Sequence, residues 1–133
     1  MRYCADTWFI LQAFDKNSTA ISLITETKTE KTEIIIPMIV FIESYKKLFQ
    51  CGVARETIEL FFAGVEASEK IKLVTLDKAI GKEAAHISLS FHIPLIDALV
   101  AATARLTGCE VLLAKDSDYN PLMKRKYIKI KSF

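Results

Sequence analysis

The chain has 133 residues, the size of one ordinary domain, so residues 1–133 are expected to share a single hydrophobic core. Hydrophobic residues make up 51% of the chain and charged residues 26%, a mixture that excludes extensive disorder. The formal net charge of +2 does not by itself indicate a nucleic-acid binder, because 18 basic residues nearly balance 16 acidic ones.

The predicted elements of the first half alternate between the two regular structures. In chain order they are a strand at 2–5, helices at 7–14 and 21–29, a strand at 33–36, and a helix from Pro37 to about Gln50. Pro37 suits the first residue of that helix, and Gly52 closes it.

The second half continues the alternation. Its predicted elements are a helix at 54–67, a strand at 72–76, helices at 78–90 and 95–106, a strand at 110–114, a loop containing Pro121, and a strand at 127–130. Asp77 is placed to cap the helix that follows it. The order predicts an α/β fold, a three-layer α/β/α sandwich around a mainly parallel sheet of four to five strands.

Four carboxylates lie where an apolar run ends or where a helix begins: Asp6, Glu43, Asp97 and Asp116. Acids at such boundaries point toward the carboxyl edge of a parallel sheet, where α/β proteins bind ligands, so one shared metal site is predicted. Capping of a helix remains an alternative for Asp6 and for Asp97. Glu43 lies too far inside an apolar helix to be explained as a cap.

Carboxylates held close together repel one another when all are ionised, so without a metal some of their pKa values should rise. A divalent cation removes that conflict. Mg²⁺ prefers oxygen ligands and accepts phosphate oxygens, and Mn²⁺ should substitute for it.

Other chemistries find little support in the sequence. G-x-G-x-x-G, P-loop, H-E-x-x-H and G-x-S-x-G motifs are all absent, so neither an organic cofactor nor serine hydrolysis is predicted. Asp116, Asp118 and Asn120 imitate the opening of a calcium loop, but Pro121 stands where that loop needs glycine. The three cysteines show no C-x-x-C spacing, which fits a reducing cytosol.

A membrane location is not expected. The longest stretch without a charged residue, Ala84 to Ile96, is shorter than the roughly 18 to 20 residues that span a bilayer. The apolar segment near the N-terminus is interrupted by Asp6, and no signal-peptide cleavage site follows it. A cytoplasmic protein is therefore predicted.

Four segments together resemble a known family. They are Tyr3-Cys4-Ala5-Asp6-Thr7, Ile36-Pro37 leading to Glu43, Asp97 to Ala104, and Leu112 to Tyr119. In this order and context they resemble a PIN-domain ribonuclease, especially the compact VapC-type toxins of VapBC toxin–antitoxin systems. The resemblance spans nearly the whole chain.

The resemblance implies a divalent-metal-dependent endoribonuclease that hydrolyses RNA phosphodiester bonds. The expected partners are an RNA substrate, a small antitoxin protein and a second copy of the chain in a homodimer. All four acids would be catalytic, with Asp6, Asp97 and Asp116 as metal ligands. Glu43 would either bind the metal through water or orient and deprotonate the attacking water. Thr7 and Asp118 are weaker supporting candidates.

Some positions depart from the family pattern. Ala114 stands where a hydroxyl residue often precedes the last aspartate, and Met38 and Trp8 replace small polar residues. A catalytically weak acidic-pocket binding module therefore stays open as an alternative. A PIN nuclease of RNA maturation also stays open, because the residues do not separate it from a toxin. A receiver-like domain fits less well, because Asp6 is single where a receiver needs paired acids.

Basic residues are concentrated near the C-terminus, where Lys124, Arg125, Lys126, Lys129 and Lys131 fall within eight positions. A basic rim around an acidic centre would suit a polyanionic substrate, whereas a solvated terminal strand is the simpler alternative. For an antitoxin, the helix at 54–67 offers Leu60 beside its apolar stripe, although core packing or a homodimer contact could equally explain that helix.

Overall fold

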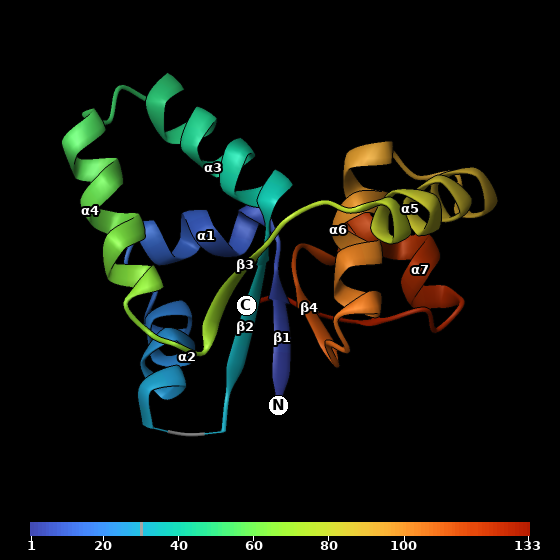
Figure 1. The fold of residues 1–133 in the computed structure, drawn as a ribbon, viewed down its shortest axis with the longest axis horizontal. Coiled ribbons are helices and arrows are strands. Elements are labelled where there is room, and N and C mark those ends of the chain that lie inside the picture. Colours follow the sequence, from blue (N-terminus) through green and yellow to red (C-terminus); the bar gives the residue numbers. More distant parts are fainter. Residues whose placement is uncertain (30) are drawn as a thin grey trace.

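A five-stranded parallel sheet forms the centre of the protein (Figure 1). The computed structural model describes residues 1–29 and 31–133, with Asp116 described by its backbone alone. The strands are β1 (Arg2–Ala5), β2 (Glu33–Pro37), β3 (Ile71–Val74), β4 (Val111–Leu113) and β5 (Lys129–Lys131). The helices are α1 (Thr7–Phe14), α2 (Ser18–Thr29), α3 (Met38–Gln50), α4 (Arg55–Glu66), α5 (Lys78–Phe91), α6 (Leu95–Leu106) and α7 (Asn120–Lys124), with a short 3-10 helix η1 (Asp116–Tyr119).

The strand order is β3-β2-β1-β4-β5, and every neighbouring pair is parallel. From β1 the chain moves outward to β2 and β3, and then returns to the other side of β1 to form β4 and β5. Helices α1 to α4 accordingly lie on one side of the sheet and α5 to α7 on the other (Figure 1). The predicted three-layer α/β/α architecture is confirmed. The order reverses between β1 and β4, and the carboxyl ends of these two strands form the switch point, the place where such sheets commonly bind ligands.

The central strands are apolar on both faces because helices cover both. Ile34, Ile35 and Ile36 of β2 are all buried, and so is the whole of β4. Such continuous apolar runs are typical of parallel strands in α/β proteins. They hold the carboxyl ends of the sheet in fixed positions.

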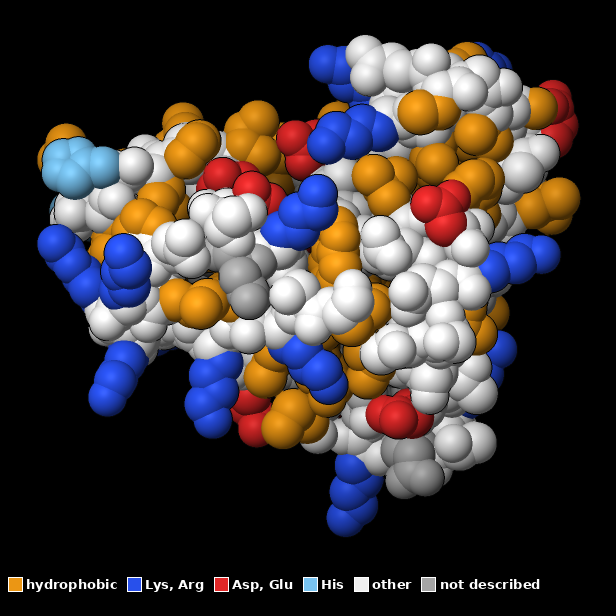
Figure 2. All heavy atoms as spheres, turned by 180° about the vertical axis from the view of Figure 1, so that it is seen from behind, with side chains coloured by type: hydrophobic (Ala, Val, Ile, Leu, Met, Phe, Trp, Pro, Cys, Tyr) orange, Lys and Arg blue, Asp and Glu red, His pale blue; other side chains and the backbone are white. Residues whose placement is uncertain are grey.

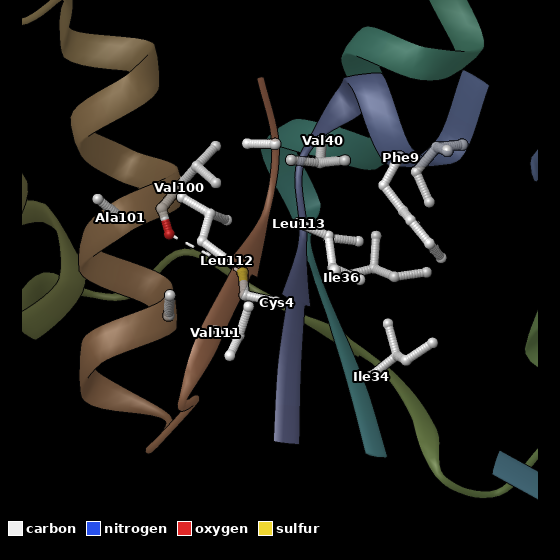
Figure 3. Close-up of a cluster of buried hydrophobic side chains, with 14 of the residues drawn as sticks. Cys4, Phe9, Ile34, Ile36, Val40, Val100, Ala101, Val111, Leu112 and Leu113 are labelled. Carbon is white, nitrogen blue, oxygen red and sulfur yellow. Dashed lines mark hydrogen bonds between the residues drawn. The ribbon is translucent and has the colours of Figure 1, made fainter. Parts of the chain in front are cut away.

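Helix α6 packs closely on the sheet because its inward side carries small residues. Ala98, Ala101 and Ala102 are fully buried, and the Cys4 thiol of β1 donates a hydrogen bond to the Val100 carbonyl oxygen at 4.0 Å (Figure 3). This packing brings the first turn of α6, with Asp97, to the carboxyl edge of the sheet.

The boundaries differ from the sequence-based expectation in a few places. Pro37 is the last residue of β2 and the N-cap residue of α3, not the first residue of that helix. Its φ of −60° and ψ of 142° are extended rather than helical. The predicted loop around Pro121 contains helix α7, where a proline in the first turn costs no hydrogen bond.

Within the described residues, no helix is long and apolar enough to cross a bilayer.

Candidate active site

Asp6 occupies the switch point of the sheet, directly after β1. Its backbone is extended at the N-cap position of α1, but its side chain makes no capping hydrogen bond. The residue is only 7% exposed. The capping alternative is therefore wrong for Asp6, whose carboxylate is held where parallel sheets bind ligands. Asp77, by contrast, is the predicted cap: its Oδ1 accepts a hydrogen bond from the Ile80 backbone N–H at 2.9 Å.

Glu43 approaches the same place from α3. The Thr7 hydroxyl donates a hydrogen bond to Glu43 Oε1 at 2.6 Å, which joins the first residue of α1 to the second turn of α3. This contact fixes the orientation of the Glu43 carboxylate. It also brings the side chain of Thr7, adjacent to Asp6, into direct contact with Glu43.

Asp97 lies in the first turn of α6 and is partly buried. Burial raises the pKa of its carboxyl group, and the nearby carboxylates of Asp118 and Glu43 raise it further. The ammonium group of Lys47, one helical turn beyond Glu43 on α3, acts in the opposite direction. Asp97 therefore shares its electrostatic environment with residues from α3 and η1.

The surroundings of the buried Asp6 carboxyl group disfavour its ionised form. Burial raises its pKa to about 6, and the charges of Asp97 and Glu43 raise it as well. The Thr7 backbone N–H and the nearby Tyr119 hydroxyl favour the ionised form and limit the rise. A carboxyl group in this state gains from any cation that binds beside it.

Tyr119 is a site residue to which the sequence assigned no role. The residue is fully buried, at 0% exposure, and its hydroxyl interacts with the Asp6 carboxylate. Burial raises its pKa well above the usual range, with Asp6 and Asp97 adding to the effect, so the hydroxyl stays a neutral donor. The sequence signal was an aromatic residue directly after Asp118, but its burial beside Asp6 depends on how η1 folds back.

The structure brings four of the candidate acids within electrostatic reach of one another: Asp6, Glu43, Asp97 and Asp118. Asp116 begins η1 just beyond β4, and its side chain lies outside the described part of the structure. Ala114, the departure noted in the sequence, is fully buried. Acidic side chains gather at the upper edge of Figure 2, between the two groups of helices, with basic side chains beside them.

The donor set fits a hard divalent cation in its chemistry. The clustered groups are carboxylates, which Mg²⁺ prefers, and the raised pKa of Asp6 marks a charge that a cation would stabilise. Among the described side chains, however, no group of three or more His, Cys, Asp or Glu is arranged closely enough to hold a metal ion.

The fold and this cluster define an α/β domain with an acidic site at the switch point of its sheet. Residues 3–124 match the model of the PIN domain, so the chain belongs to the PIN domain family. PIN domains are typically nucleases and generally use divalent metals. No curated protein matches the sequence significantly.

The structural neighbours are VapC toxins of VapBC toxin–antitoxin systems. VapBC2 from Rickettsia felis, bound to a DNA fragment from its promoter, matches with a TM-score of 0.71 at 15% identity over 100% of this chain and 99% of that one. DNA-bound VapBC from Salmonella typhimurium gives 0.70 at 14% identity, over 99% and 98%. VapC20 from Mycobacterium tuberculosis, a Sarcin-Ricin loop cleaving toxin, gives 0.68 at 16% identity, over 89% and 92%. These identities establish a shared fold.

Replacing the strained carboxylate should stabilise the metal-free protein at high pH. The pKa of Asp6 in the folded protein, about 6, exceeds the usual value of 3.8, so folding favours the protonated form. The stability that this group supports is present below pH 4 and is lost as the pH rises through 6. With EDTA at pH 8, Asp6→Asn should therefore raise the free energy of unfolding by roughly 1–3 kcal/mol.

Urea unfolding of both proteins at pH 4 and pH 8 measures this difference, which should nearly vanish at pH 4. Exposed Asp15 supplies the control, since Asp15→Asn should show no comparable pH-dependent gain. A loss of stability in Asp6→Asn at pH 8 would show that the carboxylate is satisfied without a cation.

Proposed function

We propose that the protein is a divalent-metal-dependent endoribonuclease that acts in the cytoplasm as the toxin of a type II toxin–antitoxin pair. The observation that carries the proposal is the buried Asp6 carboxylate, with its raised pKa, beside Asp97 and Glu43 at the switch point. Burying a carboxylate costs stability, and a catalytic site is where such a cost is normally found. Family membership and the VapC-like fold support the nuclease chemistry.

The proposed roles follow from the position of each group. Asp6, Asp97 and Asp116 would hold Mg²⁺ or Mn²⁺, and the ion, when bound, would polarise the scissile phosphate and make water more acidic. Glu43, oriented by Thr7, would take a proton from the attacking water. Lys47, beside Asp97, would face the negative charge of the phosphate. The phosphorus–oxygen bond to the leaving strand then breaks, and that oxygen takes a proton from solvent.

A binding module with little catalysis is the second candidate. It is favoured by the lack, among the described side chains, of a preformed group that holds a metal, and by Ala114 in place of a hydroxyl residue. Both candidates predict metal binding, whereas only the nuclease predicts cleavage. A nuclease of RNA maturation would cut as well but would have no antitoxin.

Metal binding should raise the thermal midpoint of the purified protein. A ligand present at 100 times its dissociation constant stabilises the folded state by about 2.7 kcal/mol, which corresponds to several degrees. Asp97→Asn should abolish most of the shift that Mg²⁺ or Mn²⁺ causes. Asp77→Ala removes a helix cap outside the cluster and should lower the midpoint while leaving the metal-induced shift intact. The shared metal site would be wrong if wild type and Asp97→Asn responded equally.

Cleavage of cellular RNA separates the nuclease from the binding module. Wild type with Mg²⁺ should produce discrete cut ends, EDTA should stop the reaction, and Asp6→Asn should lower its rate by at least about 10–100-fold. Mapping of the cut ends identifies the sequence or structure that is recognised. Equal cutting by wild type and Asp6→Asn would point to a contaminating nuclease and against this site.

An apolar groove suits the proposed antitoxin. A hollow of about 430 Å³ lies between α1, α2 and α4, lined by Phe14, Ile21, Ile24, Leu60 and Phe61 among others. Leu60 is 74% exposed at this groove. An amphipathic segment laid into such a groove buries its apolar side chains, which is a common mode of peptide recognition. The likeness to VapBC complexes supports an antitoxin as the occupant.

Leu60→Asp should weaken the complex with the product of a small reading frame beside the gene by about 10-fold or more, because a charge would replace buried apolar surface. Leu89 of α5 gives a matched control: it is 77% exposed and lies outside the groove, so Leu89→Asp should bind as wild type. Calorimetry with the co-expressed partner measures both. Undiminished binding by Leu60→Asp would exclude this groove.

The homodimer expected from the sequence remains a prediction. The molar mass of the purified protein, measured in solution by light scattering, tests it.

A further inference from the structure

A second concentration of charge lies at the other edge of the sheet from the acids. Arg105, Arg125, Lys126 and Lys129, here termed the basic surface, come from the end of α6, the end of α7 and the start of β5. All four side chains are exposed, and none forms an ion pair with a described carboxylate. In Figure 2, several lysine and arginine side chains project along the lower left, with an acidic side chain among them, whereas another group of acidic side chains lies at the upper edge.

Aromatic rings hold the two arginines in place. The Arg105 guanidinium lies 4.7 Å from the centre of the Tyr127 ring and donates a hydrogen bond to the Tyr127 carbonyl oxygen at 2.6 Å. Arg125 lies 5.0 Å from the centre of the Phe91 ring, and the two rings contact edge to face at 5.8 Å. A guanidinium stacked on a ring loses little further freedom when it binds a phosphate, so these two cations are pre-organised.

The surface between these side chains is hollowed. One hollow of about 420 Å³ is lined by Arg105, Lys126 and Lys129, and a second of about 600 Å³ shares Lys126 and Lys129 with it. Glu110 is the one described acid that lines either hollow. The Tyr127 hydroxyl donates to Glu83 at 2.7 Å, which ties up the nearest carboxylate of α5. The hollows are therefore suited to an anion.

The distance between the basic surface and the acidic site limits which anions are long enough to contact both. Asp97 and Arg105 belong to the same helix, eight residues and about 12 Å apart along its axis. Phosphates of a duplex strand recur about every 3.4 Å along the axis, and those of an extended single strand lie farther apart, so this distance corresponds to at most about four phosphates. A strand cut at the acidic site reaches the basic surface only with nucleotides well beyond the cut.

We propose that the basic surface binds the phosphate backbone of the RNA substrate several nucleotides away from the scissile bond, which makes a short RNA a poor substrate. The proposal rests on the nuclease function above. Its contacts go to phosphates, so they add affinity and register without reading sequence. The bend at Lys126, whose φ is +56°, closes α7 and turns the chain toward β5, and so brings Lys126 and Lys129 to the same hollow.

The test uses Lys126→Gln/Lys129→Gln, because neither lysine side chain makes a hydrogen bond or ion pair within the described residues. Binding is measured by fluorescence anisotropy in the slow-cutting Asp97→Asn background, with a labelled RNA of about 20 nucleotides and one of three, across a series of salt concentrations. The control, Lys28→Gln/Lys72→Gln, removes the same charge from α2 and β3 at the far side of the sheet.

The double variant should bind the long RNA about 10-fold more weakly, and the slope of its salt dependence should fall by roughly 1.4, the value for two phosphate contacts on a single strand. Binding of the three-nucleotide RNA should not change, and the control should bind both as the Asp97→Asn protein does. An additional variant, Arg125→Lys, keeps the charge but loses the planar stacking group, and should give an intermediate loss for the long RNA alone.

Unchanged affinity and salt slope in the double variant would overturn the proposal, as would an equal loss for both RNAs. Failure of the nuclease function gives a different result: wild type would cut nothing, while the long RNA would still depend on Lys126 and Lys129 for binding. Absence of any binding to the long RNA would refute the basic surface outright.

Discussion

The reversal of strand order between β1 and β4 is the constraint on which the site depends. Because the chain builds outward from β1 in one direction and then in the other, no crossover covers the gap at their carboxyl ends. Asp6 directly follows β1 at that gap, and α6 brings Asp97 to it from the opposite layer. Glu43 comes from the first layer on α3. The acids therefore meet because of topology, although they are far apart in sequence.

The meeting of these acids is electrostatically unfavourable, and the surrounding structure limits the cost without removing it. Thr7 holds Glu43 by a short hydrogen bond, and the Lys47 ammonium opposes the charge around Asp97. Asp6 nevertheless keeps a raised pKa, with the Tyr119 hydroxyl buried beside it. A cation bound next to Asp6 would favour its ionised form.

Positive charge is distributed so that it complements the acids rather than neutralising them. Lys47 lies near Asp97, while Arg105, Arg125, Lys126 and Lys129 form a separate surface at the amino edge of the sheet. A polyanion could then be held at two places, at the proposed cut and several nucleotides away. The small net charge of +2 conceals this division, because acids and bases cancel in the sum but not in space.

Most of the fold could be predicted from the sequence, since apolar runs and helical stripes depend on near neighbours. The strand at Arg2–Ala5 and the helix at Leu95–Leu106 were predicted with their observed bounds. Helix α7 was missed because Pro121 reads as a loop residue, and only the packing of the buried Leu122 shows that the proline lies in a first helical turn.

The sequence by itself also determined which acids end strands or begin helices, because those positions follow from the local pattern. Only the tertiary structure decided which side chains lie close enough to interact. Asp118 influences Asp97, Tyr119 is buried against Asp6, and Tyr127 supports Arg105. Each of these relations joins segments that the sheet and its covering helices bring together. Burial and charge–charge distance, which set the pKa of Asp6, do not exist until the chain has folded.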